Sequence, residues 1–296
     1  MAEDLVPRVK KLSDISKRMR ILITGGRGQL GRSLEDALAQ HQVSVLGHDE
    51  LDITDAEAVA RALDKLRPEL VIHAAAWTDT AGCEADPERA LLVNGEGSGV
   101  VAEGCHRAGA AMAYISSNEV FDGTGREPYR EDDAPNPINA YGRSKLAGER
   151  RVRSALERHY IVRTAWLYGA GRVSFPEKVL QMAAKADQLK GVADEIASPT
   201  WTADLAGGIA ALIAEASWGT YHLTNSGYCS RLEWIEEVLR IRGLTGVGVE
   251  RTTQEEFRAP YRKPVFSALS LEKARRLGIE MPPWRDALER YLRGGD

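Results

Sequence analysis

Short apolar runs alternate with segments of helical periodicity over the first half of the chain. The apolar runs predict strands at residues 20–24, 43–47, 70–76, 111–116 and 160–167. Apolar positions three and four residues apart predict helices at residues 30–39, at 54–66, from the third strand to about residue 108, and at 141–158. The spacing of Thr54 and Glu57 predicts a capping box at the start of the second helix. This alternation predicts an α/β fold with a Rossmann-type, doubly wound parallel sheet.

The regular alternation ends near Gly169. Further on, the pattern predicts helices at 204–216 and 232–240, a strand at 220–223, an irregular stretch at 255–264 and helices at the end of the chain. We therefore expect a sheet domain over residues 19–165 and a smaller cap over 166–296, interleaved with it. Residues 1–18 form an N-terminal extension in this scheme. Their four apolar residues at helical spacing leave a second interpretation open, a helix that docks on a partner subunit.

Composition excludes several classes of protein. The formal net charge is −4 and the isoelectric point is near 6.0, which argues against nucleic acid as a partner. No apolar run reaches about 18 residues, so we expect neither a membrane span nor a membrane partner. The three cysteines have no C-x-x-C spacing, which argues against a disulfide framework or a zinc site. A cytoplasmic protein without a bound metal is the expectation.

A glycine-rich turn follows the first strand and opens the first helix. It reads G-G-R-G-Q-L-G at residues 25–31. Glycines at such a turn let backbone N–H groups approach a pyrophosphate, which the helix N-terminus also favours. The turn predicts a dinucleotide site, and its candidate residues are Gly25, Arg27, Gly28, Gln29, Leu30 and Gly31.

Two features near this turn bear on the choice between NADPH and NADH. A carboxylate that binds the adenosine ribose is expected near the end of the second strand, where Asp49 is nearest and Asp52 and Ile53 follow. Arg27 would instead match a 2′-phosphate, since a guanidinium fits phosphate oxygens. We predict NADPH, with NADH as the alternative.

A second pattern of reactive residues lies in the middle of the chain. Tyr141 and Lys145 form Y-x-x-x-K at the head of a helix, so phenol and ammonium share one helix face. A nearby cation is expected to lower the pKa of the phenol and make it a better proton donor or acceptor. The strand at 111–116 also ends in a polar stretch, Ser116, Ser117, Asn118 and Glu119.

Several longer motifs together resemble a known family. They are H-A-A-A-W-T at 73–78, Y-I-S-S-N-E-V-F-D-G at 114–123, P-Y-R-E-D-D-A-P-N-P-I-N-A-Y-G-R-S-K-L-A-G-E at 128–149, R-T-A-W-L-Y-G at 163–169 and S-P-T-W-T-A-D-L-A at 198–206. With the glycine turn, they are similar to the extended short-chain dehydrogenases/reductases, and within these to the dTDP-4-dehydrorhamnose reductase family. The resemblance extends over nearly everything from Met19 onward.

The resemblance implies reduction of the C4 ketone of a nucleotide-linked 4-keto-6-deoxy sugar by NAD(P)H. Ser117 would contact the carbonyl, Tyr141 would donate the proton, and Lys145 would bind the nicotinamide ribose. The first domain would then bind the cofactor and the smaller region the sugar, and a homodimer is expected. Further implied site residues are Ala74, Ala75 and Ala76 beside the cofactor, Asn94 facing the site, and Asn118, Glu119, Trp166 and Arg262 for the substrate.

The chain departs from the family pattern where a carboxylate and a ring are expected. The family motif S-T-D-Y-V-F-D-G is S-S-N-E-V-F-D-G here, so Asn118 replaces Asp and Glu119 replaces Tyr. The segment also resembles S-T-D-E-V-Y of nucleotide-sugar dehydratases, so an epimerase or dehydratase that uses Glu119 as a base is an alternative. A non-catalytic, NADP-binding regulatory subunit is another.

Overall fold

The computed structural model describes residues 18–258 and 261–294. The interpretation of residues 1–18 as an extension or a docking helix falls almost entirely outside these ranges. Over the part described, no helix combines the length and apolar character that a membrane span requires.

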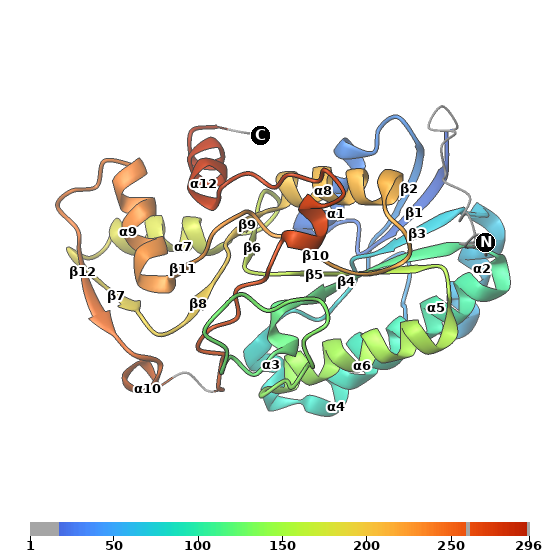
Figure 1. The fold of residues 1–296 in the computed structure, drawn as a ribbon, viewed down its shortest axis with the longest axis horizontal. Coiled ribbons are helices and arrows are strands. Elements are labelled where there is room, and N and C mark those ends of the chain that lie inside the picture. The colour runs from blue at the N-terminus through green and yellow to red at the C-terminus, as the bar shows by residue number, and fades with distance from the viewer. Residues whose placement is uncertain (1–17, 259–260, 295–296) are drawn as a thin grey trace, which may run out of the picture.

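A six-stranded parallel sheet forms the centre of the molecule (Figure 1). Its order is β10-β5-β4-β3-β1-β2, and all neighbouring strands run parallel. The strands are β1 (Arg20–Thr24), β2 (Gln42–Leu46), β3 (Leu70–His73), β4 (Ala111–Ser117), β5 (His159–Thr164) and β10 (Gly219–His222). The predicted Rossmann-type sheet is thus confirmed. The chain reverses direction across the sheet between β1 and β3, which is where ligands bind in such folds.

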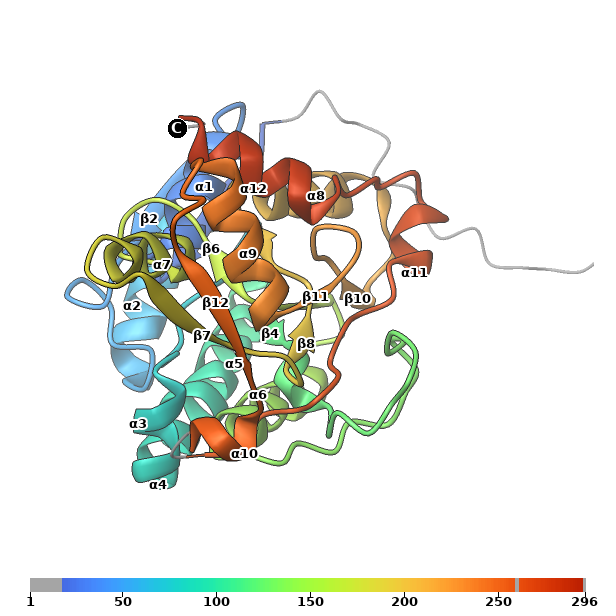
Figure 2. The same ribbon diagram turned by 90° about the vertical axis from the view of Figure 1, so that its left-hand side faces the viewer.

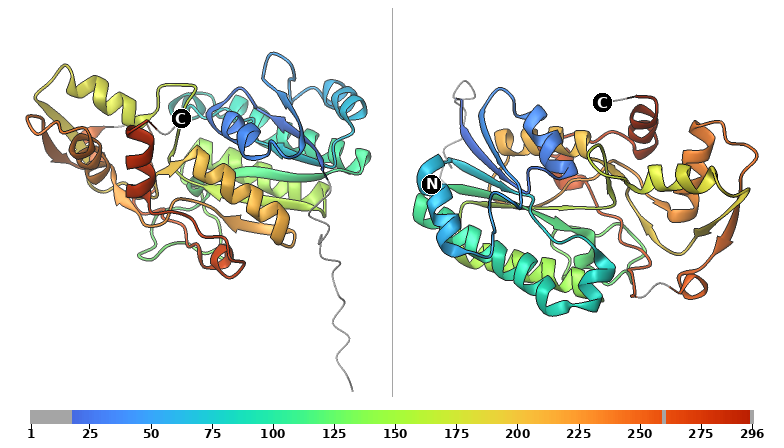
Figure 3. Two further views of the ribbon diagram at one scale, coloured as in Figure 1. Left: turned by 90° about the horizontal axis from the view of Figure 1, so that it is seen from above. Right: turned by 180° about the vertical axis from the view of Figure 1, so that it is seen from behind.

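Helices cover both faces of this sheet (Figure 3). On one face lie α1 (Gln29–Ala37) and α8 (Thr202–Glu215), and on the other lie α2 (Ala56–Leu66), α5 (Gly97–Ala108) and α6 (Ala140–Ala155). Side chains of β1 alternate between the two cores: Ile21 and Ile23 pack towards α1 and α8, and Leu22 packs towards α2 and α5. Burial on both faces explains why the strands read as continuous apolar runs.

Two local predictions were wrong. The helix expected to run unbroken to residue 108 is divided into α3 (Thr80–Ala85), α4 (Pro87–Ala90), a π-helical segment η1 (Leu91–Glu96) and α5. Asp86 starts α4 by capping Arg89 N, and the next residue is a proline, which cannot continue a helix. The cap of α2 is Asp55, whose carboxylate accepts from two backbone N–H groups, whereas Thr54 bonds to Asp52.

The smaller half of the molecule has a separate core that includes Trp234 and Trp284. Its helices are α7 (Phe175–Ala183), α9 (Arg231–Ile241), α10 (Gln254–Phe257) and α12 (Trp284–Leu292), whereas α11 (Glu272–Arg275) contacts β10 of the main sheet. Figure 2 shows helices α7, α9 and α12 from the side of this half. Its two-stranded sheets pair β6 (Leu167–Tyr168) with β9 (Thr200–Trp201), β7 (Gln188–Val192) with β12 (Gly248–Thr252), and β8 (Ile196–Ala197) with β11 (Cys229–Ser230). Because α8 and β10 lie on the main sheet, the chain passes between the two halves. The domain boundary at 165/166 stays a prediction.

Candidate active site

A cavity of about 580 Å³ lies at the carboxyl ends of β1, β3, β4 and β5. It brings together most of the residues predicted from sequence: Gly25, Gly28, Gln29, Leu30, Gly31, Ile53, Ala74, Ala75, Ala76, Ser117, Asn118, Glu119, Tyr141, Lys145 and Trp166. Arg27, Asp52 and Arg262 are not among its lining residues. Residues from six separate stretches of the sequence thus meet where parallel sheets place their ligands.

The glycine turn packs directly on the end of β3. Gly25 has φ +69°, and a Cβ there would lie 2.5 Å from the backbone N of Ala75. A Cβ on Gly31 would overlap the backbone of Gly26. Helix α1 begins after Gly28 with no side-chain cap from any residue that the structure describes. The first-turn N–H groups are therefore placed to bind a pyrophosphate, as the motif predicts.

Of the candidates for the adenosine end of the cofactor, Arg27 and Asp52 lie outside the cavity lining and Ile53 is part of it. Arg27 is exposed and pairs with Glu50 at 3.2 Å, and Glu50 also accepts from Gly47 N at 2.8 Å. The carboxylate of Asp52 bonds to Thr54 instead. Sequence reasoning named Asp49 for the end of β2 and missed Glu50. The carboxylate of Glu50 and the guanidinium of Arg27 therefore lie side by side just after β2.

Asn94 holds the loop that follows β3 at the cavity. Its side chain accepts from Trp77 N at 2.8 Å and donates to Trp77 O at 3.0 Å. It also donates to Ser144 Oγ at 3.0 Å, and so connects the loop after β3 to α6. The asparagine implied by the resemblance is therefore buried beneath the site.

Helix α6 presents Tyr141 and Lys145 to the end of β4. Asn139 caps it by accepting from Gly142 N at 2.8 Å. A Cβ on Gly142 would overlap the carbonyl oxygen of Glu119, so glycine is needed for this close approach. The helix start and the polar strand end thus form one unit, in which Ser117 Oγ accepts from Glu119 N at 3.1 Å.

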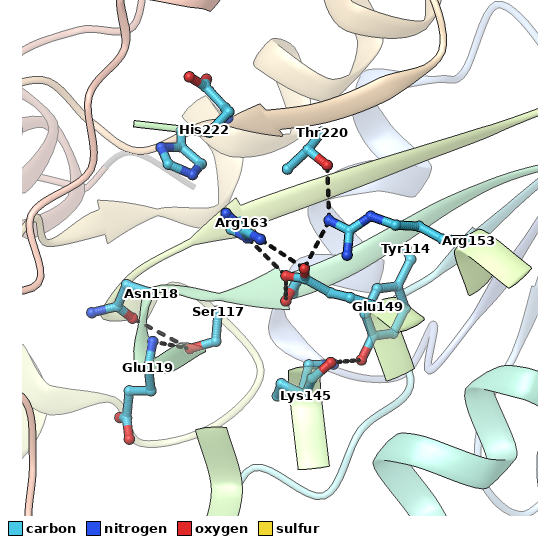
Figure 4. A network of polar contacts seen from close by, with 12 residues as sticks. Tyr114, Ser117, Asn118, Glu119, Lys145, Glu149, Arg153, Arg163, Thr220 and His222 are labelled. Carbon is cyan, nitrogen blue, oxygen red and sulfur yellow. Dashed lines mark hydrogen bonds and ion pairs between the residues drawn. The ribbon is translucent and has the colours of Figure 1, made fainter. Parts of the chain in front are cut away.

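Lys145 is buried, and its Nζ lies 4.3 Å from the centre of the Tyr114 ring. Burial lowers the pKa of this lysine to about 7, and the opposing charge of Glu149 acts to raise it. Glu149 is itself fixed by two hydrogen bonds of 2.8 Å from Arg163 and one of 2.7 Å from Ser116 Oγ. Figure 4 shows this network beneath the end of β4. A fixed carboxylate one helical turn away therefore favours the charged lysine.

The pKa of Tyr141 is shifted in the direction opposite to the expectation. Burial raises the pKa of the phenol, the charge of Glu119 raises it further, and the hydrogen bond with Ser117 acts to lower it. The sequence showed that Lys145 lies one helical turn from Tyr141. It did not show how deeply the phenol is buried or that the carboxylate of Glu119 acts on it. Tyr141 is therefore protonated at neutral pH, which is the form that a proton donor needs.

The two unusual residues of the strand end have different surroundings. Asn118 is buried, donating to Ser267 Oγ at 2.7 Å and accepting from Ser117 Oγ at 3.3 Å. Glu119 accepts from Asn139 Nδ2 at 2.7 Å, and burial raises the pKa of its carboxyl group. Asn118 thus has protein partners on both polar atoms, whereas Glu119 keeps a titratable group on the cavity wall.

Several cavity residues were missed by sequence reasoning. They are His48, Trp77, Thr78, Thr80, Arg89, Arg172, Arg231 and Lys263. Lys263 directly precedes Pro264, so an alignment that keeps the residue before the proline would have selected it in place of Arg262. Arg231 lies 3.6 Å from the centre of the Trp166 ring. None of the motifs that carry the family resemblance includes Arg231.

Comparisons with known proteins identify the family. The model of the RmlD substrate binding domain family matches residues 19–295. The chain belongs to this family. Among curated relatives, a dTDP-4-dehydrorhamnose reductase of Streptomyces griseus is 41% identical over 280 residues, which cover 92% of each chain. A probable dTDP-4,6-dihydroxy-2-methyloxan-3-one 4-ketoreductase of Streptomyces antibioticus is 39% identical and covers 91% of this chain and 93% of its own.

Solved structures agree with this assignment. The dTDP-4-dehydrorhamnose reductase of Bacillus anthracis in complex with NADP superimposes with a TM-score of 0.89 at 35% identity. The match covers 93% of this chain and 99% of that chain. The resemblance predicted from the motifs is thus confirmed for this member of the RmlD family.

Proposed function

We propose that this protein is an NADPH-dependent reductase of the C4 ketone of a dTDP-linked 4-keto-6-deoxy sugar. The observation that carries the proposal is the meeting of Ser117, Tyr141 and Lys145 with the glycine turn in one cavity. The dTDP-4-dehydrorhamnose reductase of Streptomyces griseus, the probable 4-ketoreductase of Streptomyces antibioticus and the NADP-bound reductase of Bacillus anthracis support it.

Each of the site residues would have a separate role in the reaction. NADPH, when bound, would supply the hydride that adds to C4 of the sugar. The glycine turn and the alanines after β3 would hold this cofactor. Ser117 Oγ would donate a hydrogen bond to the ketone oxygen, and Tyr141 would transfer its proton to that oxygen as the C–O bond gains charge. Lys145 would bind the nicotinamide ribose and stabilise the phenolate that remains.

The experiment is an NADPH oxidation assay with dTDP-4-dehydrorhamnose and with other dTDP-4-keto-6-deoxy sugars, followed by product identification. The proposal predicts oxidation with formation of the 4-hydroxy sugar. Water loss or inversion without net NADPH oxidation would instead support the dehydratase or epimerase alternative, with Glu119 as the base. Tight NADPH binding without turnover of any keto sugar would support the regulatory-subunit alternative. A homodimer and a cytoplasmic location stay predictions.

Arg27→Ala is expected to raise the KM for NADPH by about tenfold and to change the KM for NADH less than twofold. An exposed guanidinium that binds a 2′-phosphate contributes a charge-assisted hydrogen bond of roughly 1.5 kcal/mol, and 1.4 kcal/mol corresponds to about tenfold. Steady-state kinetics with both cofactors measure this. Arg61→Ala is the matched control, because Arg61 pairs with Glu57 on the surface of α2. An unchanged NADPH:NADH preference in Arg27→Ala would contradict the assignment.

Glu119→Tyr is expected to lower the KM for dTDP-4-dehydrorhamnose at least threefold, since it restores the family's ring on the cavity wall. Glu119→Gln separates loss of charge from gain of the ring, and it keeps an acceptor for Asn139. Saturation kinetics of both variants test the expectation. If neither variant changes kcat or KM, Glu119 does not face the substrate.

A further inference from the structure

We propose that Asn139 is a positioning residue that connects the smaller half of the molecule to the proton donor Tyr141. Asn139 directly precedes helix α6, which carries Tyr141 in its first turn. The residue is 1% exposed and does not line the cavity. This inference rests on the proposed function, because Tyr141 is the acid of that reaction.

The amide group of Asn139 connects three parts of the chain. Its Oδ1 accepts from Gly142 N at 2.8 Å, in the first turn of α6. Its Nδ2 donates to Glu119 Oε2 at 2.7 Å, just after β4, and to Arg262 O at 3.0 Å, between α10 and α11. An amide nitrogen has two hydrogens to donate, so both are used. One buried side chain therefore fixes the positions of these three segments relative to one another.

The backbone around Tyr141 is held on both sides. Glu84 Oε2, from α3, accepts from Ala140 N at 2.7 Å, and Asn139 accepts from Gly142 N. Tyr141 lies between these two residues, so a displacement of this turn would move the phenol directly. A displacement of about 1 Å in a reacting group can cost about a hundredfold in rate.

The segment that contains Arg262 is anchored to the smaller half of the molecule. Ile196, in β8, donates its backbone N–H to Val265 O at 2.8 Å. The carbonyl oxygen of Ile196 accepts from Ser267 N at 2.8 Å. Through Arg262 O, Asn139 therefore connects a strand of the smaller half to the start of the catalytic helix on the main sheet.

The bond from Asn139 to Glu119 also affects the charge beside Tyr141. Burial raises the pKa of Glu119, and the charge of Lys263 and the hydrogen bond from Asn139 act to lower it. After burial, the charge of Glu119 is the next cause that raises the pKa of Tyr141. The titratable and charged groups that act on Glu119 or are acted on by it are Lys263, Arg231, Glu195, Tyr141 and Cys83. Loss of the amide should therefore change the ionisation of Glu119 as well as the position of the phenol.

The experiment compares Asn139→Ser with Asn225→Ser in the full chain. Serine keeps an N-cap acceptor for α6 and removes both amide donors. Asn225 is the matched control, because it makes the same kinds of bond. It accepts from Trp201 N at 2.8 Å and donates to Asp204 Oδ2 at 2.7 Å and to Pro282 O at 3.1 Å. It is buried and does not line the cavity, so both variants should lose thermal stability to a similar extent.

Asn139→Ser is expected to lower the single-turnover rate of NADPH oxidation at least tenfold, while the Kd for NADPH stays within twofold. Amide hydrogen exchange of the ligand-free protein, followed by mass spectrometry, should become faster in peptides that cover residues 140–146 and 261–267. Asn225→Ser should change neither the rate nor the exchange of these peptides.

The pH profile of the single-turnover rate is a readout that loss of stability alone does not move. Ionisation of Glu119 raises the pKa of Tyr141, so the rate should fall as pH rises through the pKa of Glu119. Without the amide donor the carboxylate is less stabilised, so this fall should move to higher pH in Asn139→Ser. It should be absent in Glu119→Gln.

Three results would each overturn the proposal. They are an unchanged rate in Asn139→Ser, unchanged exchange at residues 261–267, and an equal loss of rate in Asn225→Ser. Asn139→Asp, which keeps the cap acceptor and has no donor when ionised, replaces the serine variant if that variant does not fold. Faster exchange in both peptides with no keto-sugar reduction by the wild type would refute the reductase and keep the connection. Reduction at the wild-type rate in Asn139→Ser would do the reverse.

Discussion

Tyr141→Phe is expected to lower kcat by two or more orders of magnitude while the Kd for NADPH stays within about twofold. A positioned acid contributes about 10²–10⁴-fold to a proton transfer, and phenylalanine removes only the hydroxyl group. The buried phenol is protonated at neutral pH, so the wild-type residue is already in the donating form. The loss should therefore appear in the chemical step and be the same across neutral pH. Single-turnover NADPH oxidation measures it.

Tyr168→Phe is the matched control for this variant. Tyr168 is buried in the core of the smaller half and does not line the cavity, and its hydroxyl has no hydrogen-bond partner among the described residues. Its kcat should equal that of the wild type. A Tyr141→Phe enzyme with unaltered turnover would refute the proposed mechanism, and equal losses in both variants would indicate a general effect of removing a phenol.

The sequence was sufficient where local pattern determines structure. Strands buried on both faces give apolar runs, and close contacts require glycine at Gly25, against Ala74 and Ala75, and at Gly31, against Gly26. Sheet and turn were therefore predictable. The break before α4 was missed because Pro87 and the Asp86 cap interrupt a stretch whose apolar spacing stays helical on both sides. Periodicity alone does not show such a break.

Other properties of the site depend on tertiary structure. Arg231 and Lys263 both form ion pairs with Glu195, and the three residues come from distant segments of the chain. No local spacing in the sequence indicates these contacts. The direction of the pKa shift of Tyr141 likewise depends on burial and on Glu119, which comes from another element. The sequence was enough to predict that Tyr141 and Lys145 share one face of a helix. It was not enough to predict how packing that helix against β4 changes the pKa of Tyr141.

Lys145→Met is expected to reduce turnover at least a hundredfold and to make the cofactor-free protein more stable. Burial is the first cause of the lowered lysine pKa, so the folded state bears a cost for holding this charge. Methionine has a similar length, keeps a favourable contact with the Tyr114 ring and leaves Glu149 paired with Arg163. The expected gain is on the order of 1 kcal/mol or more, or roughly 2 °C in melting temperature.

The pH dependence of that gain is the sharper test. Below a pH of about 7 the lysine is charged in both states, so the folded wild type bears the full cost of burying the charge. Between pH 7 and its ordinary pKa of 10.5, the folded state loses the proton first, and wild-type stability rises with pH. The advantage of Lys145→Met should therefore be larger at pH 6 than at pH 9. Lys185→Met, on the exposed end of the segment after α7, should show no such dependence. If the stability advantage of Lys145→Met instead grew with pH, favourable charge interactions would be stabilising the charged lysine. Burial of Lys145 would then not destabilise the folded protein.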